Sequence, residues 1–260
     1  MFKKLFKRKE KNNIEPEKPS QNETSLIDLI EESKTKKSRF SKKQKILIAV
    51  TSICLALIIA VGAFAFSLFY VKKDYETVAS FSNMPEPVQI ETTGGVTKSI
   101  DNYDITIDFK ASYTLVGKVV ETYYYFPYKM INKLSRFDFG MAWGAMSDDT
   151  YEDYISYKNN GNRFLTYKYK NSLVDILGSK EAVVNSISNN HMIHANNHVL
   201  KLLRNVRVGD HIKIEGYLSY VSYKSDHSYG DWNSSLSRTD HGDGACEIIY
   251  VTNITWLKSK

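Results

Sequence analysis

An uninterrupted apolar stretch constrains this chain more than any other feature of its sequence. Between Lys45 and Lys72 lie twenty-six residues without a charged side chain. A helix needs about 20 apolar residues to cross a hydrocarbon core of about 30 Å, so the stretch can span a membrane with some tilt. A cleavable signal peptide is the alternative, because Ala63-Phe-Ala65 has the small residues of a cleavage site. Signal cores are roughly 7–15 residues long. We therefore predict an uncleaved transmembrane helix over residues 45–72.

The charges on either side of this stretch predict its orientation. Residues 1–45 carry +7, whereas the whole chain carries +6, so the remainder carries −1. Because positive flanks remain in the cytoplasm, we expect a single-pass protein of the cell membrane with a cytoplasmic N-terminus and an extracytoplasmic C-terminal domain. The tail over residues 1–44 is basic and polar, and we predict that it is mostly disordered and contacts the lipid bilayer. A near-neutral outer part argues against a nucleic-acid partner.

The region after the apolar stretch predicts a linker and one folded domain. Prolines and paired glycines between residues 73 and 101 are typical of a stalk, with the domain following over residues 102–260. Alternating patterns predict strands around Ile105, over 113–125, over 163–170 and over 247–257. Ser179 is placed to cap one short helix that runs to about Ser188, and Asn196 or Asn197 is placed to cap a second.

This order of elements predicts the fold class. Strands, then helices, then strands, without regular alternation, favour an α+β domain over a parallel doubly wound fold. The phrase from Val208 to Tyr220 resembles a strand of an OB-like barrel, so a small barrel with helical insertions is a second form of the same prediction. Gly117 lies inside a predicted strand, where a bulge or a close backbone approach is expected.

Histidines between residues 189 and 198 suggest one kind of chemistry. If this segment is helical, His191, His194 and His198 share a face, and imidazoles at that spacing can bind zinc. The pair Asn196-Asn197 is a helix break, and no glutamate stands where a zinc protease needs one. We therefore predict no metal and no cofactor, with ordinary surface or loop histidines as the interpretation.

A second segment, residues 232–247, is dense in reactive side chains. A nucleophile from this segment, with His191 as base and Asp240 as the orienting acid, would make a hydrolase. The alternative is a hairpin turn at Gly242–Gly244 leading into the last strand. The candidate catalytic residues are His191, Ser234, Ser235, Arg238, Asp240 and Cys246.

The aromatic residues point to binding. The chain contains 18 tyrosines and 3 tryptophans, and the run from Tyr123 to Tyr128 places aromatic rings on both faces of a strand. Such rings either fill the core or contact a partner, since aromatics are enriched in interfaces. The candidate binding residues are Tyr124, Trp143 and Trp232. Trp143 either fills the core or lines a groove.

Four phrases carry a resemblance to other proteins: Trp143-Gly144, Asn190-His191, the segment from Ser234 to Asp240, and Gly244-Ala-Cys-Glu247. Together they are similar to an uncharacterised group of bacterial membrane-anchored proteins, a resemblance that implies an address and no activity. Two functions from different classes follow. The first is an extracytoplasmic binding or scaffold protein of the cell envelope, with envelope proteins or a second copy as partners. The second is the membrane-tethered hydrolase.

Overall fold

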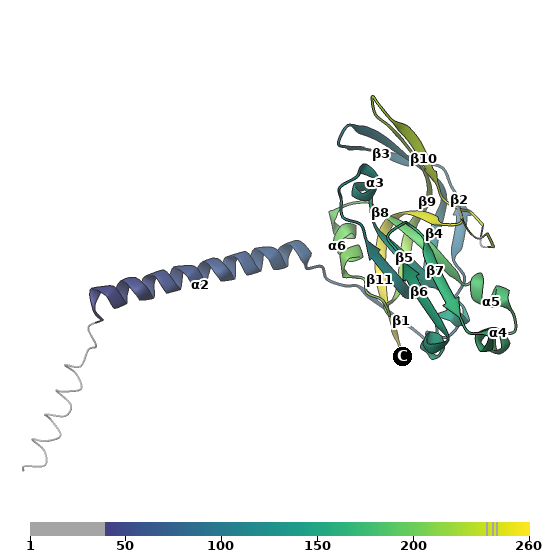
Figure 1. Cartoon of the computed structure of the whole chain (residues 1–260), viewed down its shortest axis with the longest axis horizontal. Coiled ribbons are helices and arrows are strands. Elements are labelled where there is room, and N and C mark those ends of the chain that lie inside the picture. Colours follow the sequence, from purple (N-terminus) through teal and green to yellow (C-terminus); the bar gives the residue numbers. More distant parts are fainter. Residues whose placement is uncertain (1–39, 238, 241, 243) are drawn as a thin grey trace, which may run out of the picture. The chain divides into compact units, whose positions relative to one another are not determined.

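The computed structural model describes residues 40–260, with gaps at 238, 241 and 243 (Figure 1). It contains one long apolar helix and a strand-rich α+β region. The chain separates into two units at Ala63, inside the long helix, and each is described by itself. Most of the predicted tail lies outside the described residues.

The long helix α2 runs from Lys42 to Phe69. Its window of highest hydropathy has a mean of 2.8, and none of that window is buried. The hydroxyl of Thr51 donates to the carbonyls of Leu47 and Ile48 at 3.0 and 2.9 Å, so this polar side chain is satisfied within the helix. By length and composition the helix can span a membrane.

Nine strands of the described residues form one sheet. These strands are β1 (Tyr75–Val78), β2 (Val88–Glu91), β3 (Gly95–Ile100), β4 (Tyr103–Tyr124), β5 (Ser135–Ala142), β8 (Ile187–His194), β9 (His211–Lys224), β10 (Tyr229–Asn233) and β11 (Glu247–Ser259). The pairings β4–β5, β5–β8, β8–β11, β11–β9 and β9–β4 return to the strand where they begin. Of these five pairs only β8–β11 is parallel. The last strand is central, as predicted, because it pairs with β1, β8 and β9.

Strand β4 is long enough to pair with four other strands, β2, β3, β5 and β9. Its register shifts between Phe109 and Ala111 in the pairing with β9, and between Val119 and Glu121 in the pairing with β5. A Cβ at Gly117 would lie 2.3 Å from the carbonyl oxygen of Ala142, which confirms the predicted close backbone approach. These irregularities bend the strand and change which side chains face each core.

Two apolar clusters lie on opposite faces of the sheet. The first contains Phe139, Met192 and Ile249 and is covered by α6 (Asn197–Asn205). The amide of Val199 donates to the side chain of Asn196 at 3.0 Å, which confirms the predicted cap. The second cluster contains Ile193 and Ile248 together with residues of β3, β9 and β10.

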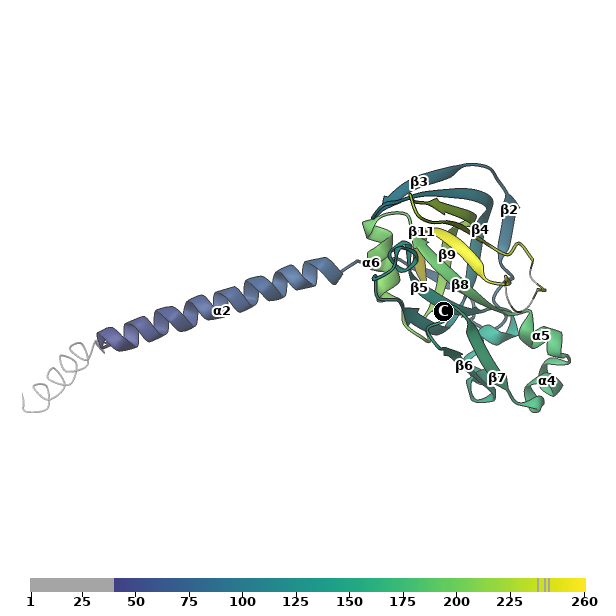
Figure 2. The same ribbon diagram turned by 45° about the horizontal axis from the view of Figure 1, so that its top comes forward.

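Figure 2 shows an insertion between β5 and β8 that contains β6, β7, α4 and α5. Its residues form a smaller third apolar cluster. The insertion contains the 3-10 segments η1 (Ala145–Ser147) and η2 (Asp149–Tyr154), the strand pair β6 (Ile155–Asn159) and β7 (Leu165–Tyr169), and helices α4 (Asn171–Leu177) and α5 (Lys180–Val184). The short helix α3 (Met130–Leu134) lies between β4 and β5. Ser179 caps α5 as predicted, through a bond of 3.0 Å from the amide of Ala182.

The structure differs from the sequence-based expectations in two segments. Residues 73–101, predicted as a stalk, contain β1, β2 and β3, all paired with the sheet. These strands are four to six residues long and largely exposed, so their patterns are too short to stand out between Pro85, Pro87 and the glycines. The helix capped by Ser179 ends at Val184, and β8 begins at Ile187, because the following residues form a continuously buried strand between β5 and β11.

Candidate functional site

A buried aspartate lies at the centre of the polar residues on β5 and β8. Asp138 on β5 is directly opposite His191 on β8 in the antiparallel register, so the two side chains share a face. Nδ1 of His191 lies 2.8 Å from Oδ1 of Asp138. The two residues are 1% and 2% exposed. This contact fixes the orientation of the imidazole, as a carboxylate does for a catalytic or structural histidine.

An arginine from the insertion completes the charge balance. Arg163, between β6 and β7, places Nη1 3.0 Å from Oδ1 of Asp138. Its Nη2 donates to the side-chain oxygen of Asn132 at 2.8 Å and to the carbonyl of Ser135 at 2.9 Å. The planar guanidinium matches several acceptors at once, which a lysine cannot do. The ion pair therefore holds the insertion against β5.

Tyr125, directly after β4, joins the same network. Its hydroxyl donates to Oδ2 of Asp138 at 2.8 Å and accepts from the amide of Arg163 at 3.0 Å. The guanidinium of Arg163 lies 3.8 Å from the ring centroid of Tyr125. Burial and the negative charge of Asp138 raise the pKa of Tyr125, so this hydroxyl remains a donor. Both oxygens of Asp138 are thus engaged.

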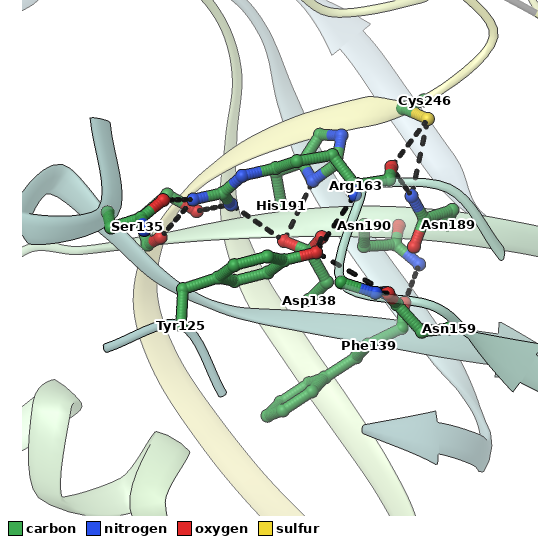
Figure 3. Close-up of polar contacts among 12 residues, drawn as sticks. Tyr125, Ser135, Asp138, Phe139, Asn159, Arg163, Asn189, Asn190, His191 and Cys246 are labelled. Atoms are coloured by element: carbon green, nitrogen blue, oxygen red, sulfur yellow. Dashed lines mark hydrogen bonds and ion pairs between the residues drawn. The ribbon is translucent and has the colours of Figure 1, made fainter. Parts of the chain in front are cut away.

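The backbone of Arg163 is itself unusual. Its φ is 70°, in the left-handed region that side chains other than glycine rarely adopt. The carbonyl of Arg163 accepts from Nδ2 of Asn189 at 2.7 Å, and that nitrogen also lies 3.3 Å from Sγ of Cys246 (Figure 3). Several contacts on both sides of the residue therefore stabilise a strained conformation.

Trp232, on β10, covers the histidine. The ring centroids of Trp232 and His191 are 4.5 Å apart, and the guanidinium of Arg163 is 5.4 Å from the tryptophan ring. Two residues predicted from sequence, His191 and Trp232, are thus brought together. Their contact closes His191 to solvent rather than opening it.

The predicted serines are engaged elsewhere. The hydroxyl of Ser234 accepts from the amide of Ile248 at 3.0 Å and donates to the carbonyl of Ser235. The hydroxyl of Ser235 donates to Oδ2 of Asp240 at 2.6 Å. Asp240 therefore contacts a serine, and the acid beside His191 is Asp138. Over residues 40–260, outside the three gaps, neither serine hydroxyl bonds to His191. Arg238 lies outside the described residues.

A small cavity holds two of the other predicted residues. Its volume is about 150 Å³, and Asn189, Asp240 and Cys246 are among its lining residues together with Phe164 and Tyr167. The cavity borders the network through Asn189, whose side chain bonds to Arg163. Cys246 contacts the network through Nδ2 of Asn189 and the carbonyl of Arg163, whereas Asp240 lines the cavity and bonds to Ser235.

The predicted binding residues have different surroundings. Trp143 is 4% exposed and packs in the first apolar cluster, so its ring is part of the core. Tyr124 is 46% exposed and contacts Phe137, with ring centroids 5.2 Å apart. Only Tyr124 and Trp232 have ring surface outside the core.

An exposed aromatic loop follows Tyr124. Phe126 is 57% and Tyr128 80% exposed, and their ring centroids are 4.4 Å apart. The carbonyl of Phe126 accepts from Nδ2 of Asn132 at 3.2 Å and from the amide of Tyr128 at 2.8 Å. We call residues 124–128 the aromatic loop. Because Tyr125 and Asn132 both bond to Arg163, the buried network holds this loop in place.

The histidines do not form the zinc face considered from sequence. His191 and His194 lie on β8, where residues three apart face opposite sides of the sheet, and His198 lies on α6. Among the described residues, no group of three or more His, Cys, Asp or Glu side chains could hold a metal ion.

Sequence reasoning missed Asp138, Arg163 and Tyr125 as site residues. They are separated along the chain and belong to no recognisable motif. The run of aromatics from Tyr123 to Tyr128 was the one available signal for the aromatic loop. Comparison with known proteins finds no matching family model, no matching curated protein and no matching solved structure.

Proposed function

We propose that this chain is a single-pass protein of the bacterial cell membrane whose outer domain binds an envelope protein through the aromatic loop. The observation that carries the proposal is the set of exposed rings at Tyr124, Phe126 and Tyr128 above a buried, charge-balanced network. The apolar helix α2 and the basic residues before it support the anchor and a cytoplasmic N-terminus.

We further propose that the outer domain is an OB-like barrel with helical insertions. In such barrels the first strand pairs with the second and fourth, and the third pairs with the second and, in parallel, with the fifth. Counted along the chain, strands one to five are β4, β5, β8, β9 and β11, and their pairings follow this order. Helix α6 lies between strands three and four, β8 and β9. OB-fold proteins bind ligands on strands two and three and on the loops after strands one and four. Here those parts carry Asp138, His191, the aromatic loop and Trp232.

The chemistry of the aromatic loop favours a protein partner. Aromatic side chains provide large contact areas with few rotatable bonds, and they are enriched in the residues that dominate protein–protein affinity. The bonds from Asn132 and Arg163 order the loop before binding, which lowers the entropy lost on association. The residues after the tail have a net charge close to zero, which argues against the basic surface that nucleic-acid binding requires.

Site-specific photo-crosslinking in cells tests the proposal. A benzoylphenylalanine at Tyr128 is compared with one at Tyr229, which is 87% exposed and lies on β10 outside the aromatic loop. We expect a discrete protein adduct from position 128 and none of the same mass from 229. Asn132→Ala removes one of the two hydrogen bonds to the carbonyl of Phe126 and should weaken that adduct.

The identity of the adduct decides between partner classes. A defined envelope protein supports the proposal, and an adduct of twice the chain mass identifies a second copy as the partner. Identical adduct patterns at positions 128 and 229, or an adduct that is glycan alone, would contradict a protein-binding loop.

A membrane-tethered hydrolase is the second candidate, favoured by the contact of 2.8 Å between His191 and Asp138. That contact resembles the acid–base pair of a catalytic triad, with Ser234, Ser235 or Cys246 as nucleophile. Two features weigh against it: Trp232 covers the imidazole, and both serine hydroxyls bond to other groups, Ser234 to the amide of Ile248 and Ser235 to Asp240.

Labelling of the intact chain separates the two candidates. Fluorophosphonate modification of Ser234 or Ser235, or alkylation of Cys246 that is faster than for free cysteine, would support the hydrolase if His191→Gln abolishes it. No labelling, or labelling unchanged by His191→Gln, would contradict the hydrolase and leave binding as the remaining candidate function.

A further inference from the structure

A pocket lies between β4 and the insertion. Lys118, on β4, is directly opposite Ala142 of β5, which belongs to the third apolar cluster, so the lysine side chain faces the insertion. Ile155 and Tyr157 are two residues apart on β6 and share a face. Lys118, Ile155 and Tyr157 all line the pocket, whose volume is about 230 Å³. Since a cavity of about 150 Å³ holds a benzene ring, this pocket has room for a ring with a small substituent.

The acidic side chains at the pocket are already bonded within the chain. Nζ of Lys118 lies 2.6 Å from Oδ1 of Asp149 and also forms an ion pair with Glu152. Oδ2 of Asp148 accepts from the hydroxyl of Ser82 at 2.6 Å, and its Oδ1 accepts two further bonds. These hydrogen bonds lower the pKa of Asp148 to about 2, so it is ionised at neutral pH. Three carboxylates against one ammonium disfavour a bound anion, and because all three are bonded, none is left to hold a bound amine.

Hydrogen-bond donors, in contrast, remain at the pocket. The hydroxyl of Tyr157 is buried and has no hydrogen-bond partner among the described residues. Burial raises the pKa of Tyr157, so the hydroxyl keeps its proton and can donate. An ammonium has three N–H donors, and Nζ of Lys118 bonds to two carboxylates in the described part of the chain. Buried polar atoms are nearly always bonded, so these donors require an acceptor.

We propose that this pocket binds a small neutral carbonyl compound with an apolar body, whose oxygen accepts from the hydroxyl of Tyr157. A carbonyl oxygen adds no charge beside the three carboxylates, and its second lone pair can accept from Lys118. Val120, Met146 and Ile155 supply apolar lining for the body of the ligand. The lining residues lie outside the aromatic loop, so the site goes beyond the proposed protein partner.

Three probes of similar shape and different charge test the chemistry of the ligand. Benzamide, benzoate and benzylamine are titrated separately into the full chain in phosphatidylcholine nanodiscs at pH 7. Binding is followed by NMR of the chain labelled at its methionine methyl groups. We expect a saturable shift of the Met146 methyl with benzamide, and binding about fivefold weaker or more for the benzoate anion and for the benzylamine cation.

The wild-type chain also locates the site. Met146 lines the pocket, whereas Met192 is fully buried in the first apolar cluster. The methyl of Met192 should therefore not move while that of Met146 shifts.

A matched pair of variants identifies the donor. Tyr157→Phe removes a hydroxyl without a partner among the described residues, so the fold should be retained and benzamide should bind about fivefold more weakly. Tyr169→Phe should leave binding unchanged, because Tyr169 belongs to the same apolar cluster but does not line the pocket.

Four results would each overturn the proposal. They are the absence of a saturable benzamide shift, benzoate or benzylamine binding as tightly as benzamide, equal shifts of Met146 and Met192, and equal affinities in Tyr157→Phe and Tyr169→Phe.

Discussion

Two polar clusters share strands β5 and β8 but differ in charge balance. Around Asp138, one carboxylate meets one guanidinium, one imidazole and one phenol, and both of its oxygens are bonded. At His194, the backbone carbonyl accepts from Nζ of Lys98 on β3 at 2.7 Å, and burial and the charges of Lys98, Arg136 and Arg204 lower the pKa of the imidazole. The first cluster is complete by itself, as a structural network is. In the second, Nε of Arg136 and Nδ1 of His194 are buried without a hydrogen-bond partner among the described residues.

The largest expected effect comes from removing the central carboxylate. Asp138→Ala leaves a guanidinium, a phenol and an imidazole buried without their shared acceptor, and we expect a loss of about 3–5 kcal/mol in the free energy of unfolding. Urea titration of the purified chain measures it. Asp231→Ala is the control, because that exposed carboxylate also accepts from a tyrosine hydroxyl, at 2.9 Å. Equal losses in both variants would show that the Asp138 network is not special.

The second effect is a dependence of stability on pH that originates in His194. Its pKa is about 4 in the folded chain and 6.5 ordinarily. Between these values the unfolded chain binds a proton that the folded chain does not, so stability falls as the pH drops from 6.5 to 4. The loss is on the order of 3 kcal/mol at most. Urea midpoints at pH 7 and 4.5, in chloride buffers, measure it.

His194→Gln removes this contribution, so its midpoint should fall less than that of the wild-type chain. His227→Gln, at an exposed histidine, should behave like wild type. A wild-type slope in His194→Gln would mean that the second cluster does not oppose protonation.

A smaller effect is expected when the guanidinium is replaced and its charge is kept. Arg163→Lys retains a cation near Asp138 but loses the planar contacts with Ser135 and Asn132, which should lower the free energy of unfolding by about 1–2 kcal/mol. Fluorescence-monitored unfolding measures the loss. Arg207→Lys, at an exposed arginine, serves as the control, and a change there as large as in Arg163→Lys would argue against a geometric role.

The smallest effect is predicted in the second cluster. Lys98→Met removes one cation from a group that repels it, so the free energy of unfolding should change by less than about 1 kcal/mol. The pKa of His194 should rise in the same variant, as NMR would detect. A loss comparable to that of Asp138→Ala would indicate that Lys98 has a partner of opposite charge.

Local patterns predicted the parts of the fold that depend on neighbouring residues. The uncharged stretch predicted the long helix, the asparagines at 196 and 197 indicated the cap of α6, and the alternation after Glu247 predicted the central strand. Strands β1 to β3 escaped because four to six residues hold too little periodicity, and their pairing partners lie far along the chain.

The site was predictable only in fragments. His191 and Trp232 were singled out separately, but their contact depends on how β8 and β10 pack. The acid assigned to His191 was Asp240, whereas the register of β5 and β8 provides Asp138. Arg163 reaches the network through a left-handed residue in a loop, and no local pattern indicates such a conformation.

The pairing of β4 with β9 also determines when this domain can fold. Asp104 pairs with Lys224 and Lys118 with His211, so strands from opposite ends of the domain must meet. Contacts so distant along the chain slow folding, because the intervening loop loses entropy before the pairing is gained. Until β9 has been made, one edge of β4 has unpaired backbone N–H and C=O groups. The nascent chain is therefore expected to need protection from aggregation between the synthesis of β4 and that of β9.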